Sequence, residues 1–86
     1  MVMKLKSPIL VDGKKIEEIS LAEPTFDDMA EIGVPSDVSS TQEKLALMKK
    51  YVARCSGLPE VAVGQIKASD AMKLLEQVTD FFIVQE

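Results

Sequence analysis

The side chains most able to do chemistry in this chain are carboxylates, because histidine is absent and Cys55 is the sole cysteine. Residues 17–37 contain seven acids and no basic residue: Glu17, Glu18, Glu23, Asp27, Asp28, Glu31 and Asp37. A calcium loop would need acids at alternating positions with a glycine, and a zinc site would need Cys or His ligands. Neither pattern occurs, so no metal site is expected. The segment indicates a solvated acidic surface, or a docking surface for a basic partner.

Nucleophilic catalysis is not expected either. Without histidine there is no Ser–His or Cys–His pair that could activate a nucleophile. Cys55 lies in an amphipathic stretch with Arg54 adjacent, which predicts a small buried side chain and no reactive thiolate. The sequence therefore predicts no catalytic residues, no cofactor-binding residues and no cofactor.

Composition also limits the partners. The chain has 86 residues, a formal net charge of −4 and a pI near 4.8. This acidity argues against a nucleic-acid partner, because binding to a phosphate backbone needs clustered Lys and Arg. The apolar runs are far shorter than the roughly 20 residues that span a bilayer, and no signal peptide is recognisable. We expect one soluble domain, residues 1–86, in a reducing cytoplasm.

Residues 4–22 predict a β-hairpin. Asp12-Gly13 is a strong turn signal between two stretches of partly alternating apolar residues, since both residue types tolerate positive φ. Ile16 and Ile19 are an odd number of positions apart, which predicts a bulge near Glu17-Glu18. Because an isolated hairpin is marginally stable in water, helices must cover it.

The remainder predicts three to four short helices, so the expected fold class is α+β. The expected helical ranges are 25–33, 40–56, 59–66 and 69–84. Thr25 with Asp28, and Ser40 with Glu43, have the spacing of capping boxes, and Ser69 is expected to cap the last helix.

Helical periodicity predicts which residues of the two longer helices face the core. In the range 40–56 the apolar stripe consists of Leu45, Met48, Val52 and Cys55, widened by Leu47 and Tyr51. In the last helix the stripe consists of Ala71, Leu74, Leu75, Val78, Phe81 and Phe82.

The last helix ends in four consecutive apolar residues, Phe81, Phe82, Ile83 and Val84. On a helix they point in all directions, so at least one would be exposed in a monomer. An exposed apolar patch on a small domain commonly marks an interaction site. The alternative is that this turn is covered by the hairpin and helices, or joins the hairpin as a further strand. These four residues are the candidate partner-binding site.

Short segments along most of the chain, from about residue 8 to residue 82, form an ordered pattern. They are Pro8-Ile9, Asp12-Gly13, Ile19-Ser20-Leu21, Glu23-Pro24-Thr25, Asp28-Met29, Cys55-Ser56-Gly57-Leu58-Pro59, Ser69-Asp70 and Phe81-Phe82. Together they resemble the small tail assembly chaperones of contractile-tailed, myovirus-type temperate bacteriophages and prophages.

The resemblance implies a non-enzymatic function. Such proteins bind the long, helical tape-measure protein and keep it soluble while tail-tube subunits polymerise around it. It implies a location in the cytoplasm of the bacterial host and absence from the mature virion. Further partners that it implies are tail-tube subunits, other copies of the chain, and a longer form made by ribosomal frameshifting, of which this chain would be the shorter product.

Two other classes of protein remain open from the residues alone. A small acidic regulator or inhibitor, of the antitoxin or DNA-mimic type, would explain the negative charge by binding a basic protein. Against it, Lys44, Lys49, Lys50 and Arg54 make a separate surface basic. A helix-turn-helix DNA binder is suggested by the last two helices, but the second of these offers only Lys73 as a cation.

Overall fold

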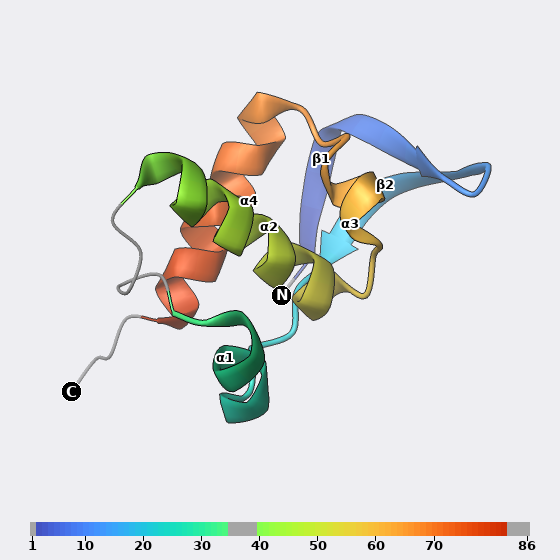
Figure 1. Ribbon diagram of the computed structural model, residues 1–86. Helices are drawn as coiled ribbons and strands as arrows, with labels where there is room; N and C mark the ends of the chain where they lie inside the picture. The colour runs from blue at the N-terminus through green and yellow to red at the C-terminus, as the bar shows by residue number, and fades with distance from the viewer. Residues whose placement is uncertain (1, 35–39, 83–86) are drawn as a thin grey trace.

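The computed structural model describes residues 2–34 and 40–82, and its fold is α+β as predicted. An N-terminal antiparallel hairpin is followed, within these ranges, by four helices (Figure 1). The elements are β1 (Val2–Val11), β2 (Lys14–Ser20), α1 (Phe26–Ile32), α2 (Thr41–Ser56), α3 (Glu60–Val63) and α4 (Ala68–Phe81). The hairpin lies beside the helices and its turn extends beyond them, while α2 packs against each of the other helices.

The hairpin turn has the conformation that its sequence predicts. Asp12 and Gly13 both have positive φ, at 52° and 79°, and Val11 pairs with Lys14 across them. Positive φ at both central residues is the signature of a type I′ turn, whose twist matches that of the flanking strands.

The irregularity in the hairpin lies at the level of Glu17-Glu18, as predicted, but the additional residues are on β1 and not on β2. Lys4 pairs with Glu18 and Ile9 pairs with Ile16, so five steps along β1 match two steps along β2. The additional β1 residues include Pro8, which has no N–H to donate to the ladder. A carboxylate from α4, described below, accepts the two N–H groups that precede Pro8. The additional residues of β1 thus contact a distant element through their backbone.

The core lies where the hairpin meets α2, α3 and α4. Its least accessible apolar side chains are Ile19, Leu21, Tyr51, Leu74 and Val78. The predicted stripe of α2 is correct for Met48, Val52 and Cys55 but wrong for Leu45, which is 48% exposed. The buried face of α2 is centred on Tyr51 and Cys55, which places Leu45 at its edge.

Side-chain caps mark the starts of α1 and α2 but not those of α3 and α4. Thr25 and Asp28 form a complete capping box for α1, and the Ser40 hydroxyl accepts the Glu43 N–H at the start of α2. α3 follows Pro59, whose side chain cannot cap. α4 begins at Ala68 with Lys67 at the N-cap and no side-chain cap, so the prediction that Ser69 caps it is wrong.

The predicted ranges 25–33 and 40–56 agree with α1 and α2 to within one residue at each end, and the other two ranges differ by more. The range 59–66 contains only α3, since Gly64 follows its last residue and valines have low helix propensity. The range 69–84 contains most of α4, which ends at Phe81, and residues 83 and 84 lie outside the described residues. Within the ranges 2–34 and 40–82, no helix has the length and apolar character needed to cross a membrane.

Candidate functional site

The reactive groups of the described residues do not converge. In that part of the chain no group of three or more His, Cys, Asp or Glu side chains could hold a metal ion. Cys55 is buried, as predicted, and this burial, with a smaller contribution from the negative charge of Asp28, raises the pKa of its thiol. The Cys55 thiol therefore stays protonated at neutral pH.

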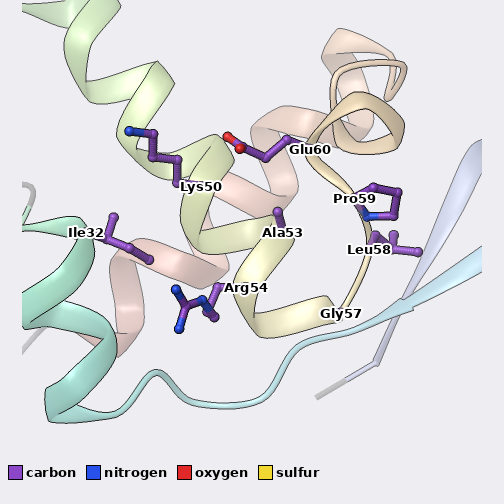
Figure 2. Close-up of a pocket in the computed structure, with 8 residues that line it drawn as sticks. All are labelled: Ile32, Lys50, Ala53, Arg54, Gly57, Leu58, Pro59 and Glu60. Atoms are coloured by element: carbon purple, nitrogen blue, oxygen red, sulfur yellow. The ribbon is translucent and has the colours of Figure 1, made fainter.

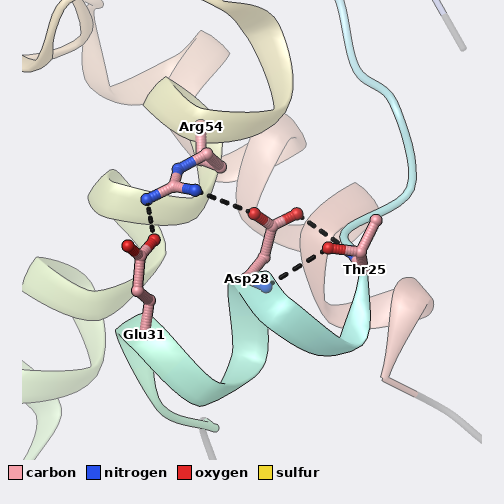
Figure 3. Close-up of polar contacts among 4 residues, drawn as sticks. All are labelled: Thr25, Asp28, Glu31 and Arg54. Atoms are coloured by element: carbon pink, nitrogen blue, oxygen red, sulfur yellow. Dashed lines mark hydrogen bonds and ion pairs between the residues drawn. The ribbon is translucent and has the colours of Figure 1, made fainter.

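Part of the acidic segment is used inside the fold, where it holds α1 against α2 (Figure 3). Arg54 Nη1 lies 3.0 Å from Asp28 Oδ1, and Arg54 Nη2 also pairs with Glu31 Oε2. The other Asp28 oxygen accepts the Thr25 N–H at 2.9 Å. This backbone hydrogen bond, assisted by the Thr25 hydroxyl and Arg54, lowers the pKa of Asp28. The pKa of Arg54 is raised, first by Glu31 and then by Asp28.

α1 is held by polar contacts and by Ile32, which packs against the core. The helix has seven residues and none of them is buried. Besides Arg54, the buried Tyr51 hydroxyl donates a hydrogen bond to the carbonyl oxygen of Gly33, directly after the helix. At the other end Phe26 is 85% exposed. The result is a fixed short helix that presents an aromatic ring to solvent.

A wide hollow lies between α1, the end of α2 and the connection to α3 (Figure 2). Its volume is about 580 Å³ and it is open to solvent. Ile32, Leu58 and Pro59 supply apolar surface, and Lys50 and Glu60 supply opposite charges. Small-molecule sites bury most of their ligand. An open hollow of mixed character such as this one is better suited to contact with a polypeptide.

A smaller groove lies between α2, α3 and α4, with a volume of about 170 Å³. We call it the three-helix groove, and its apolar lining consists of Leu45, Val52, Val63, Ile66, Ala71, Leu74 and Leu75. The one charged residue that lines it is Lys49, whose ammonium lies near Gly64. The groove can therefore take a nonpolar side chain with a negative charge beside it.

The predicted partner-binding residues are only partly described. Phe81 and Phe82 are half-buried and pack against the core. The Phe82 ring meets the Tyr51 ring edge to face, with centroids 5.0 Å apart and planes at 72°. Ile83 and Val84 lie outside the described residues. Phe82 therefore supports the fold, and the interaction site at these four residues stays a prediction.

Sequence reasoning missed a fully buried acid. Asp70, in the first turn of α4, is fully buried, and its two carboxylate oxygens accept the N–H groups of Lys6 and Ser7, each at 3.0 Å. These two hydrogen bonds lower the pKa of Asp70. The available signal was its position, because Asp70 lies four and eight residues before Leu74 and Val78, on the buried stripe.

Comparison with known protein families decides how these surfaces are to be interpreted. Residues 2–83 match the family model described as phage tail assembly chaperone proteins, E, or 41 or 14. The chain belongs to this family. Comparisons with curated proteins and with solved structures gave no match. The match confirms the resemblance at the level of phage tail assembly chaperones, and it favours this class over a small acidic regulator.

A tail assembly chaperone acts through contact with tail proteins, so its accessible apolar side chains are the first candidates for function. The large exposed ones among the described residues are Val2, Leu10, Phe26, Leu45, Val61 and Met72. Leu45 lines the three-helix groove and Phe26 projects from α1. Both side chains are exposed, and both are attached to elements whose position is fixed by contacts with the rest of the fold.

Proposed function

We propose that this tail assembly chaperone binds the tape-measure protein of its phage and keeps it soluble while tail-tube subunits assemble around it. The family match over residues 2–83 is the observation that supports this function. The role is non-enzymatic and is carried out in the cytoplasm of the bacterial host, and the chaperone is absent from the mature virion. The phage or prophage is of the contractile-tailed, temperate type.

The surface suits a helical client. A long helix with apolar residues at heptad positions aggregates unless those residues are covered. Amphipathic helices bind in apolar grooves through residues spaced along one face. The chaperone offers accessible nonpolar side chains on several elements, and its net charge of −4 helps to keep a complex in solution.

The client-binding site that we propose is the C-terminal apolar run, Phe81, Phe82, Ile83 and Val84. Phe81 and Phe82 each retain accessible surface beyond their contacts with the core. Further partners in the proposal are tail-tube subunits and a longer, frameshifted form of the chain, which would extend this same end.

Co-expression with the tape-measure protein of the same phage tests the function. We expect the chaperone to increase the soluble fraction of the tape-measure protein and to co-purify with it through a tag on the chaperone. A tape-measure protein that remains insoluble and is not captured would refute the proposal.

A variant with Ile83→Asp and Val84→Asp tests the site, and capture should fall strongly. Val61→Asp is the control, because Val61 is 77% exposed on α3 and the change adds a negative charge elsewhere. Phe82 is left unchanged because its ring contacts Tyr51. Undiminished capture by the double variant would show that the C-terminal apolar run is not the client-binding site.

A further inference from the structure

A further hollow lies between the hairpin and the start of α4, at the opposite end of this helix from Phe81. It is open to solvent and has a volume of about 610 Å³. Residues 8–10 of β1 form one wall, and the connection from α3 to α4 forms the other. We call it the hairpin hollow, and its lining consists of Pro8, Ile9, Leu10, Gly64, Gln65 and Lys67.

The β1 wall of the hairpin hollow carries exposed apolar side chains. Leu10 is 63% exposed and Pro8 is exposed as well, whereas Ile9 between them is buried in the core. The turn that follows extends beyond the helices (Figure 1), so the helices do not cover this part of the hairpin. A lone exposed leucine is common on protein surfaces, so the groups around Leu10 decide what it can bind.

The backbone of Leu10 has unused hydrogen-bonding groups. Val11 pairs with Lys14 directly across the two-residue turn, and the next pair is Leu10 with Lys15. The pair that closes such a turn is hydrogen-bonded, and hydrogen-bonded pairs alternate with pairs that are not. The N–H and C=O of Leu10 therefore point away from β2. Neither forms a backbone hydrogen bond with a helix or loop of residues 2–34 and 40–82.

The available edge of β1 is short. Upstream of the hollow, the N–H groups of Lys6 and Ser7 donate to the Asp70 carboxylate. Pro8 has no N–H to donate. An additional strand could therefore pair with β1 only from Ile9 toward the turn, which suits a segment of a few residues and excludes a long strand.

The charges around the hairpin hollow are positive. Residues 2–16 contain four lysines and the single acid Asp12, although the whole chain has a net charge of −4. Lys67 lines the hollow, and Lys6 and Lys14 flank residues 8–11 along the chain. These three lysines form no ion pair within the part of the chain that the structure describes. Their charges are available to an acidic partner, because complementary charge favours both encounter and orientation.

We propose that the hairpin hollow binds a short, extended, acidic segment of a partner protein, which pairs with Leu10 at the edge of β1 and places its carboxylates beside Lys67. Main-chain hydrogen bonds give such an added strand its affinity, and its side chains give the specificity. The exposed Leu10 side chain favours an apolar residue at the centre of the segment. β2 is the less suitable edge, because Glu17 and Glu18 are exposed there and would repel carboxylates. This surface is separate from the proposed client-binding site.

NMR titration of the isotope-labelled chain with synthetic peptides tests the proposal. No tail protein is present, so the outcome is independent of the proposed function. The probe is the capped peptide EEVTVEE, whose β-branched centre favours an extended strand. We expect saturable shifts of the amide signals of residues 9–11 and 64–67. KKVTVKK, in which every charge is reversed, should bind at least roughly threefold more weakly. EEVPVEE lacks the central N–H and should also bind more weakly.

Variants of the chain separate the contributions of backbone and charge. Leu10→Pro and Leu10→Ala both lose the leucine side chain, but only Leu10→Pro loses the outward N–H, so it should bind EEVTVEE roughly fivefold more weakly than Leu10→Ala. Lys67→Glu should weaken binding of this peptide by roughly three- to tenfold. Lys44→Glu is the matched control, because it reverses the same charge at an exposed position on α2 and should leave binding within about twofold of the wild type.

Several results would overturn the proposal. They are the absence of saturable shifts at residues 9–11 and 64–67 up to the solubility limit of EEVTVEE, equal binding of EEVTVEE and KKVTVKK, and a Lys67→Glu variant that binds like the wild type. Duplex DNA that shifts the same amides at lower concentration than the peptide would refute a polypeptide as occupant. Shifts of these amides on dilution of the chain alone would assign the hollow to a second copy instead.

The amide spectrum of each variant reports whether it is folded. If Leu10→Pro does not fold, Lys67→Glu still decides the outcome, because Lys67 is exposed and precedes the first residue of α4.

Discussion

Replacement of Tyr51 by Phe would measure how strongly α1 is attached to the rest of the chaperone. The side chain is fully buried and its hydroxyl donates to the Gly33 carbonyl oxygen. Removing the hydroxyl deletes one hydrogen bond, with a net contribution of about 1 kcal/mol, and leaves an acceptor without its partner, so we expect a loss of about 1–2 kcal/mol. At roughly 2.1 cal/mol/K per residue, an 86-residue domain has an unfolding entropy near 180 cal/mol/K. The midpoint temperature of thermal unfolding should therefore fall by about 5–11 °C.

Calorimetry measures the shift in the midpoint of thermal unfolding, and amide hydrogen exchange shows which part of the chain is destabilised. We expect faster exchange in α1 of Tyr51→Phe, because the end of this helix is then released. Phe82→Leu is the matched control, since it removes the ring contact with Tyr51 and keeps the hydroxyl. A midpoint within about 1 °C of the wild type, with unchanged exchange in α1, would show that this hydroxyl does not hold the helix.

Three further predictions concern the core and its buried polar groups. The pKa of Asp70 is lower in the folded chain than in the unfolded chain, so its stabilising contribution is present above the unfolded value and is lost as pH falls through the folded value. Urea denaturation from pH 7 to about pH 3 should show a larger loss in the wild type than in Asp70→Asn, where the lowered pKa of Asp28 still contributes. Leu74→Ala should lower the free energy of unfolding by about 2–5 kcal/mol, whereas Met72→Ala, at a side chain that is 60% exposed, should change it by less than about 0.5 kcal/mol. Burial raises the pKa of the Cys55 thiol, so a thiol reagent at pH 8 should react slowly with the folded chain and rapidly in denaturant, and equal rates would contradict the structure.

Local signals predicted the local structure well. The Asp12-Gly13 pair sets the hairpin turn through positive φ, and Thr25 with Asp28 starts α1, because each of these signals acts within four residues. The α2 stripe was predicted with an error at Leu45, since periodicity gives a direction but not the width of the surface that other elements cover.

Long-range contacts account for what the sequence did not show. Asp70 is surrounded by residues that predict a solvated first helical turn, and only its partners on β1 make it a buried acceptor. The additional residues of the strand irregularity lie on β1 beside the same contact, and the sequence of β2 gave no sign of this. The candidate surfaces were missed for a similar reason, because the three-helix groove exists only where separate helices meet.

The attachment of β1 to Asp70 also has a consequence for how the chain matures during translation. The two hydrogen bonds join residues 64 and 63 positions apart. During translation they can therefore form only after α4 has left the ribosome, long after β1. Contacts of such large sequence separation slow folding. A nascent chain that is halted before α4 would therefore carry a first strand in which the N–H groups of Lys6 and Ser7 lack their carboxylate acceptor.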